Sequence, residues 1–231
     1  MPINSVQKKL SVVLPCLNEE GGVGICINKI QQVFARQGLD GEIIVVDNGC
    51  TDSTVLVARS LGVRIVTEPR SGYGNACRAG INQAQGELII IGDADNSYDF
   101  FEMPKLLEGI EQGGDLVVGS RFLGQMQAGA MSYSRKWGNY LLRLLLKSNG
   151  LGIQETCTGF IAFRKEVLTR FCLVSSGMEF SSEVLLRFHQ GGLKIQEVPI
   201  NYYKRFGTSK LNEFRDGFRH FTFILRQSLG H

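Results

Sequence analysis

The sequence lacks the features that would mark several protein classes. Its 231 residues carry a net charge of only +3, with no basic block and no interleaving of basic and aromatic residues, so we expect no nucleic-acid partner. No run approaches the ~20 apolar residues of a membrane-spanning helix. Lys8 and Lys9 lead straight into a strand, which is not the pattern of a signal peptide. Six cysteines are scattered without CxxC spacing, which argues against zinc and indicates free thiols in a reducing cytoplasm.

What is present indicates one α/β domain. The chain is 43% hydrophobic and 20% charged, which is a globular composition. Short apolar runs of strand type alternate with amphipathic helical stretches through the first half, and this alternation predicts a mostly parallel, Rossmann-like sheet flanked by helices. We expect strands at 10–14, 42–46, 63–66, 88–91 and 115–118, and helices after 18, up to 61, within 72–84 and at 103–112.

The second half is less regular. Helical spacing predicts helices at 135–147 and 178–189, a strand-like segment starting at 158–160, and a late strand at 194–198. A final helix is expected from about residue 212. It places Phe214, Phe218, Phe221, Leu225 and Leu229 on one side.

The most informative stretch is the apolar run 88–91 followed by Gly92, Asp93 and Asp95. Parallel sheets bind ligands beyond the carboxyl ends of their strands, so both acids are expected at the edge where chemistry occurs. Two neighbouring carboxylates suit Mg²⁺ or Mn²⁺ shared with substrate phosphates. The alternative is that Asp95 only caps the following helix. At the end of the first strand, Asn18 is similarly expected to cap a helix, and Asp47 ends the second strand.

Taken together, the motifs resemble the family 2 glycosyltransferases of the GT-A fold. More narrowly, the chain is similar to the polyprenyl-phosphate (dolichyl or undecaprenyl) hexosyltransferases, the group of dolichyl-phosphate mannose synthase. The resemblance runs from residue 11 to about 226, and its order and spacing carry it. The matching segments are 15–19, 47–52, 70–76, 93–95, 119–121, 158–160, 197–200 and 205–211.

The resemblance implies an inverting hexosyltransferase that uses a nucleoside diphosphate sugar, UDP-glucose or GDP-mannose. Asp93 and Asp95 would hold Mg²⁺ or Mn²⁺ and would act in catalysis together with Arg121 and Arg205. The nucleotide sugar would be bound by Pro15, Leu17, Asn18, Glu19, Asp47, Asn48, Asp52, Gly74, Asn75 and Ala94.

The resemblance also implies a phosphate-bearing acceptor. The matching basic and hydroxyl positions are Arg121, Arg135, Arg205, Ser209 and Lys210, and guanidinium groups bind phosphate oxygens in pairs. A lipid phosphate is already an anion at neutral pH and needs no general base. A sugar hydroxyl acceptor would instead need a carboxylate base, for which Glu179 and Glu183 are the candidates.

The chain departs from the family in three places. Glu155 stands where relatives often have Asp, and Asn96 and Ser97 follow the acids where relatives often have Leu and Gln. Relatives also often continue into membrane-spanning helices after a sequence like 215–220, whereas this chain stops at 231.

Three other classes fit less well. The acids followed by Ser97 resemble the nucleophile motif of haloacid-dehalogenase-like phosphatases, but that motif closes an N-terminal strand. The segment from Gly72 resembles a dinucleotide loop, but Cys77 stands at the third glycine position. A non-catalytic nucleotide-sugar binding module would keep the fold and would not need the acid pair.

The last helix carries a membrane prediction. We expect a catalytic domain over 1–211 and an amphipathic helix over 212–231 that lies on a membrane surface, with Arg215, Arg219, His220 and Arg226 facing anionic headgroups. The Leu-rich helix at 140–146 would lie beside it. The alternative is that the apolar stripe packs on its own domain or on a second copy of the chain, as a homo-oligomer. The first interpretation places the protein at the cytoplasmic face of a membrane.

Overall fold

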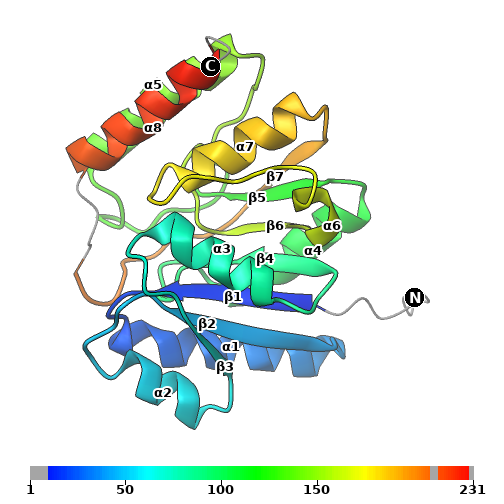
Figure 1. Cartoon of the computed structure of the whole chain (residues 1–231), viewed down its shortest axis with the longest axis vertical. Coiled ribbons are helices and arrows are strands. Elements are labelled where there is room, and N and C mark those ends of the chain that lie inside the picture. The colour runs from blue at the N-terminus through cyan, green and yellow to red at the C-terminus, as the bar shows by residue number, and fades with distance from the viewer. Residues whose placement is uncertain (1–9, 209–212, 229–231) are drawn as a thin grey trace.

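The computed structural model describes residues 10–208 and 213–228. One seven-stranded sheet with the order β3-β2-β1-β4-β6-β5-β7 runs through it (Figure 1). Only β6 is antiparallel to its neighbours β4 and β5, so the prediction of a mostly parallel sheet is confirmed. The strands are β1 Leu10–Cys16, β2 Gly41–Asp47, β3 Arg64–Thr67, β4 Leu88–Ile91, β5 Leu116–Ser120, β6 Ile161–Arg164 and β7 Ile195–Pro199.

Strand β1 lies at the centre of the parallel part, between β2 and β4, and it is longer than predicted. It contains Pro15, which cannot donate a hydrogen bond to a neighbouring strand. The pairing with β4 ends at Val13, opposite Ile91, so the missing N–H of Pro15 lies beyond that partner. The strand therefore continues alongside β2 to Cys16, opposite Asp47, and carries the chain to the carboxyl edge of the sheet.

Helices cover both faces of the sheet because successive apolar residues of each strand point to opposite sides. Val12 and Leu14 pack with α1, α2 and α4, whereas Val13 packs with α3, α5 and α7. The helical elements are α1 Glu20–Gln37, α2 Thr54–Ser60, α3 Tyr73–Gln83, the 3₁₀ turn η1 Phe100–Glu102, α4 Met103–Glu111, α5 Tyr133–Ser148, α6 Lys165–Leu168, α7 Phe180–Gln190 and α8 Glu213–Ser228.

Helix α1 does not begin as predicted. Its N-cap is Glu19, without a side-chain cap, and Asn18 has a left-handed backbone with φ 57°. The Asn18 Oδ1 accepts a hydrogen bond from the backbone N–H of Thr51 at 2.7 Å. Asn18 therefore ties the turn after β2 to the end of β1, and the expectation that it caps the helix was wrong.

Helix α3 begins directly at Tyr73, so the glycine-rich segment before it is shorter than predicted. Gly72 has φ 131°, and a Cβ at this position would lie 2.2 Å from the carbonyl oxygen of Ser176. Gly74 is equally constrained, since a Cβ there would lie 2.3 Å from the carbonyl oxygen of Ser175. Both glycines let the start of α3 approach the segment that precedes α7.

Helices α5 and α8 lie side by side, and α8 also packs on α7 (Figure 1). Within residues 10–208 and 213–228, no helix combines the length and the apolar character that crossing a membrane requires.

Candidate active site

The acid pair lies at the carboxyl edge of the sheet, where β4 ends between β1 and β6. Asp95 is 5% exposed, and its Oδ1 accepts hydrogen bonds from the N–H and hydroxyl of Ser97 at 2.9 and 2.5 Å. The residue that caps η1 is Asp99, so the alternative role of Asp95 as a helix cap was wrong. Gly159 passes directly against the other acid, because a Cβ there would lie 2.6 Å from Asp93 Oδ1.

Two cavities meet at these acids. The first has a volume of about 350 Å³ and lies over the ends of β1, β2 and β4. The second, of about 140 Å³, lies beside β6 and between α5 and α8. Both are lined by Tyr73, Asp93, Asp95, Met178, Arg205 and Asp216. Two ligands placed in the two cavities would therefore both lie against the acid pair.

Half of the predicted nucleotide-sugar residues line the first cavity. They are Pro15, Leu17, Glu19, Asn48 and Ala94. The Asn48 amide also holds the cavity wall, because it donates to the carbonyl oxygens of Glu68 and Arg70 at 2.8 and 2.9 Å and accepts from the N–H of Gly72 at 2.8 Å.

The other half, Asn18, Asp47, Asp52, Gly74 and Asn75, are not among the lining residues. They support the wall instead. Asp47 accepts from the N–H groups of Gly49 and Cys50. Asp52 accepts from the N–H of Glu20 at the start of α1 and from Thr54 at the start of α2. Their direct contact with a nucleotide stays a prediction.

Arg205 forms an ion pair with one of the two acids, Asp95. Its guanidinium lies 2.9 Å from Glu19 Oε1 and 3.3 Å from Asp95 Oδ2, and the N–H of Phe206 donates to the carbonyl oxygen of Asp95 at 2.9 Å. The segment after β7 therefore closes over the acid pair. Ser209 and Lys210, predicted beside it for the acceptor phosphate, lie outside the described residues.

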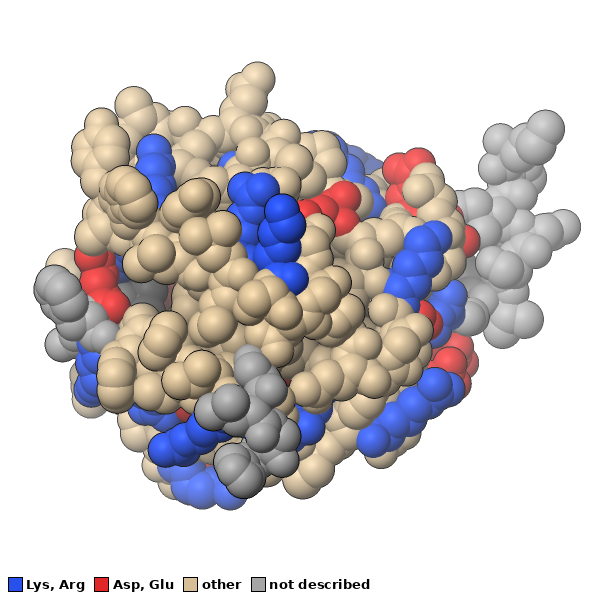
Figure 2. Space-filling view, turned by 90° about the horizontal axis from the view of Figure 1, so that it is seen from above, with Lys and Arg blue, Asp and Glu red and all other residues tan. Residues whose placement is uncertain are grey.

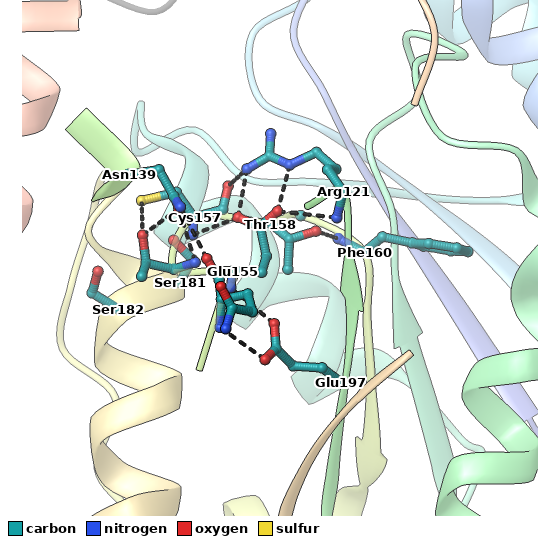
Figure 3. A network of polar contacts seen from close by, with 12 residues as sticks. Arg121, Asn139, Glu155, Cys157, Thr158, Phe160, Ser181, Ser182 and Glu197 are labelled. Atoms are coloured by element: carbon teal, nitrogen blue, oxygen red, sulfur yellow. Dashed lines mark hydrogen bonds and ion pairs between the residues drawn. The ribbon is translucent and has the colours of Figure 1, made fainter. Parts of the chain in front are cut away.

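Arg121 lies in the second cavity and is fixed by Glu155 (Figure 3). Its Nε and Nη2 each lie 2.7 Å from a Glu155 oxygen, and Nη2 also donates to the carbonyl oxygen of Cys157 at 3.0 Å. Glu155 is fully buried, and the Glu197 carboxylate accepts from the N–H groups of residues 154 and 155. The residue that departs from the family pattern is thus the ion-pair partner of the predicted phosphate-binding arginine.

Arg135, at the start of α5, also lines the second cavity. Its Nε lies 3.1 Å from Glu213 of α8. Glu213 also accepts hydrogen bonds from the hydroxyls of Ser132 and Ser134. The three predicted phosphate-binding arginines within the described residues are therefore all paired with carboxylates.

Helix α8 supplies site residues that the sequence analysis did not assign. Asp216 lines both cavities, Arg219 lines the first and His220 the second. Arg219 forms an ion pair of 2.6 Å with Glu179, and His220 is only 5% exposed. The expectation that His220 faces headgroups was wrong, whereas the Arg219 side chain stays 39% exposed and its contact with headgroups stays a prediction. The four-residue spacing of Asp216 and His220, off the apolar stripe, was the available signal.

The acids fit a divalent cation. Burial is the largest cause that raises the pKa of Asp93, from 3.8 to about 7, and the charge of Asp95 adds to it, while Arg205 and Arg121 act in the opposite direction. A second positive charge would relieve this repulsion. Among the described residues, no group of three or more His, Cys, Asp or Glu side chains could hold a metal alone. Two carboxylates with the remaining ligands from a diphosphate is an arrangement that Mg²⁺ accepts.

Comparison with known proteins identifies the family. The profile "Glycosyl transferase family 2" matches residues 11–171, and the chain belongs to this family. It is 35% identical over 99% of its length to the low-salt glycan biosynthesis hexosyltransferase Agl6 of Haloferax volcanii, of which it spans 56%. It is 32% identical to a dolichyl-phosphate hexose transferase of the same organism, with 90% of this chain and 89% of that protein covered.

The solved structures agree on the fold. Glucosyl-3-phosphoglycerate synthase from Mycobacterium tuberculosis, in complex with Mn²⁺ and UDP-glucose, superimposes with a TM-score of 0.76. The identity is 25%, and the match covers 96% of this chain and 79% of that one. The predicted GT-A architecture is confirmed.

The raised pKa of Asp93 predicts how stability depends on pH. The folded protein keeps a proton on this carboxyl up to about pH 7, whereas the unfolded chain releases it near pH 4. In chelator, the contribution of Asp93 to the free energy of unfolding should therefore decrease as pH rises from 4 to 7.

Asp93→Asn should remove this decrease in the free energy of unfolding, because the Asn side chain does not ionise. The melting temperature of the variant should therefore exceed that of the parent at pH 8 and differ little from it at pH 4. Calorimetry across this pH range is the measurement. Ser97→Ala, next to the other acid, is the control and should keep the parental pH dependence. If the melting temperatures of Asp93→Asn and the parent differ equally at both pH values, the assignment of the raised pKa to Asp93 is contradicted.

Proposed function

We propose that the protein transfers a hexose, with inversion, from UDP-glucose or GDP-mannose to a polyprenyl phosphate at the cytoplasmic face of a membrane, with Mg²⁺ or Mn²⁺. The observation that carries the proposal is the meeting of two cavities at Asp93 and Asp95. One cavity is lined by the predicted nucleotide-sugar residues, and the other contains Arg121 and Arg135.

The first cavity suits the donor. Its main support is the family relation, together with a structural neighbour that binds Mn²⁺ and UDP-glucose in the same fold. When bound, the cation supplies positive charge to the diphosphate leaving group. Asp93 and Asp95 hold that charge in place, and Arg205, already 3.3 Å from Asp95, adds a second cation beside the diphosphate.

The second cavity suits an acceptor that is already an anion. Neither of the two carboxylates considered as a base for a hydroxyl acceptor lines either cavity. Glu183 is fully buried and accepts from the N–H groups of Val174 and Ser175. Glu179 Oε1 accepts from Arg219 and from the N–H of Gly177, and its buried Oε2 has no hydrogen-bond partner within the described residues. A phosphate acceptor needs positioning and charge, which Arg121 and Arg135 supply.

A hydroxyl acceptor would need another base, and Asp216 is the acid placed for it, because it lines both cavities. This gives a sharp test of the acceptor class. Asp95→Ala should reduce turnover by about 10²–10³-fold, the usual cost of removing one preorganised electrostatic group. Asp216→Asn should cost much less with a polyprenyl phosphate acceptor.

The assay is radiolabelled hexose transfer from UDP-glucose and GDP-mannose to a short polyprenyl phosphate in Mn²⁺. Glu183→Gln is the control variant. The Glu183 carboxylate has a structural role, so a loss of activity in this variant reports a loss of fold. Full activity in excess chelator would contradict the metal assignment. A loss of several orders of magnitude in Asp216→Asn, with nucleotide binding unchanged, would contradict the phosphate acceptor.

The membrane part of the proposal is supported by the outer face of α5 and α8. This face, here called the α5/α8 surface, exposes apolar and aromatic side chains. They are Tyr133, Trp137, Tyr140, Leu141, Leu144, Phe218, Phe221 and Leu225. Figure 2 shows this side of the molecule with wide uncharged areas, among which Lys and Arg side chains and some Asp and Glu side chains are interspersed. Aromatic residues with basic neighbours are typical of a helix at a lipid interface.

The burial of its side chains shows how α8 is attached to the rest of the domain. Its side chains buried against the domain are Asp216, His220 and Ile224, whereas Phe218 is 68% exposed. The exposed stripe therefore does not pack on its own domain. A second copy of the chain would be the competing partner of this surface.

Trp137→Ser combined with Phe218→Ser should abolish sedimentation with vesicles that carry anionic lipid, because both side chains are more than 60% exposed on the α5/α8 surface. The parent should sediment at low salt and progressively less as salt screens Arg and Lys. Leu56→Ser, exposed on α2 away from this surface, is the matched control. Unchanged sedimentation of the double variant, or a dimer in solution that the double variant disrupts, would contradict the membrane assignment.

A further inference from the structure

A thiol and an imidazole face each other in the second cavity, and the proposed reaction uses neither. Cys157 Sγ lies 3.9 Å from both ring nitrogens of His220, and both residues line the cavity. His220 Nδ1 lies 2.7 Å from the hydroxyl of Ser182 on α7. A nucleophile within reach of a base that a third group orients is the arrangement that activates a cysteine.

The pair brings together three separate parts of the chain. Cys157 lies on the segment before β6 and Ser182 on the first turns of α7 (Figure 3), whereas His220 comes from α8. Because the orienting bond to Ser182 comes from a different element than the thiol, the ring is fixed independently of Cys157.

Cys157 differs from the other buried or half-buried cysteines. Burial raises the pKa of Cys16, Cys26, Cys50 and Cys77. Burial acts the same way on Cys157, but the charge of His220 and hydrogen bonds from His220 and Thr156 bring its pKa below the usual value.

The charges facing the pair come from every surrounding element. Glu155, on the same segment as Cys157, opposes the thiolate. Burial lowers the pKa of His220, but the Cys157 thiolate, together with Glu179 before α7 and Asp216 on α8, raises it above its usual value. Arg121 donates to the carbonyl oxygen of Cys157 at 3.0 Å. The arrangement therefore favours the imidazolium and the thiolate together, relative to an isolated His and Cys.

We propose that Cys157 is a modification site for small oxidants of the peroxide class, and that its oxidation blocks the second cavity. A cavity of about 140 Å³ is a few times the ~30 Å³ that a water molecule occupies in the liquid. Hydrogen peroxide can enter it, and an oxygen added to Cys157 narrows the space beside Arg121, which donates to the carbonyl oxygen of the same residue.

The oxidation of Cys157 needs no reactant other than the peroxide. The thiolate sulfur attacks one peroxide oxygen, the S–O bond forms and the O–O bond breaks. The leaving hydroxide takes the proton of His220 and becomes water. The sulfur is oxidised by two electrons to the sulfenic acid, and the peroxide is reduced.

The test is the rate of alkylation by iodoacetamide at pH 6.5, followed for each cysteine peptide by mass spectrometry on the intact chain. A thiol of ordinary pKa is only about 1% thiolate at this pH. Cys157 should therefore react ~10-fold faster than the exposed Cys172, which serves as the internal control.

His220→Gln should slow Cys157 by ~10-fold and leave Cys172 unchanged, since the imidazolium favours the thiolate. Ser182→Ala is a second variant for the case that His220→Gln does not fold, and it should slow Cys157 several-fold. Equal alkylation of Cys157 in the parent and in either folded variant would overturn the proposal.

The consequence for activity rests on the proposed function. Peroxide should abolish polyprenyl phosphate-dependent turnover in parallel with sulfenic acid on Cys157, while nucleotide binding in the first cavity persists. The remaining turnover of Cys157→Ser should not respond to peroxide. If Cys157 is oxidised and turnover continues, the blocking role is wrong, whereas the alkylation rates do not depend on any acceptor and test the activated thiol alone.

Discussion

The repulsion between Asp93 and Asp95 is the constraint on which the rest of the site depends. A buried strand delivers both acids to one edge of the sheet, and burial together with this repulsion raises the pKa of Asp93 to about 7. Arg205 compensates part of the charge at 3.3 Å from Asp95. The remaining charge makes the site unfavourable until a cation and a diphosphate join it, so an arrangement that destabilises the free protein is also what gives the site its chemistry.

The C-terminal helix connects the site to the surface. One side of α8 brings Asp216, Arg219 and His220 to the two cavities, and the other exposes Phe218 and its neighbours. The helix is held by Ile224 and Phe223, which pack in the core, and by the 2.6 Å ion pair of Arg219 with Glu179. In the proposed function, an acceptor whose apolar chain lies in a membrane would present its phosphate close to this wall.

Much of the fold, and the position of the two acids, could be predicted from the sequence. Buried apolar runs and the acids after them identified β1, β2 and β4 and their functional edge, because strand burial leaves a local pattern. Long-range partners leave no such pattern. Nothing adjacent to Arg121 indicates that Glu155 fixes it, and Asn18 reads as a helix cap although its amide reaches Thr51 in another turn. The apolar stripe of α8 was visible, whereas the buried position of His220 depends on α7 and the segment before β6.

The most direct test of the account is the thermodynamic coupling between Mn²⁺ and a nucleoside diphosphate. Calorimetric titration of UDP and GDP should show that Mn²⁺ raises the affinity for the preferred nucleotide by at least ~10-fold, a coupling of about 1.4 kcal/mol. Asp95→Ala should abolish the coupling and leave weak binding of the nucleotide in the first cavity. Equal affinity in Mn²⁺ and in chelator, or coupling that persists in Asp95→Ala, would contradict the claim that the acid pair and the diphosphate share one cation.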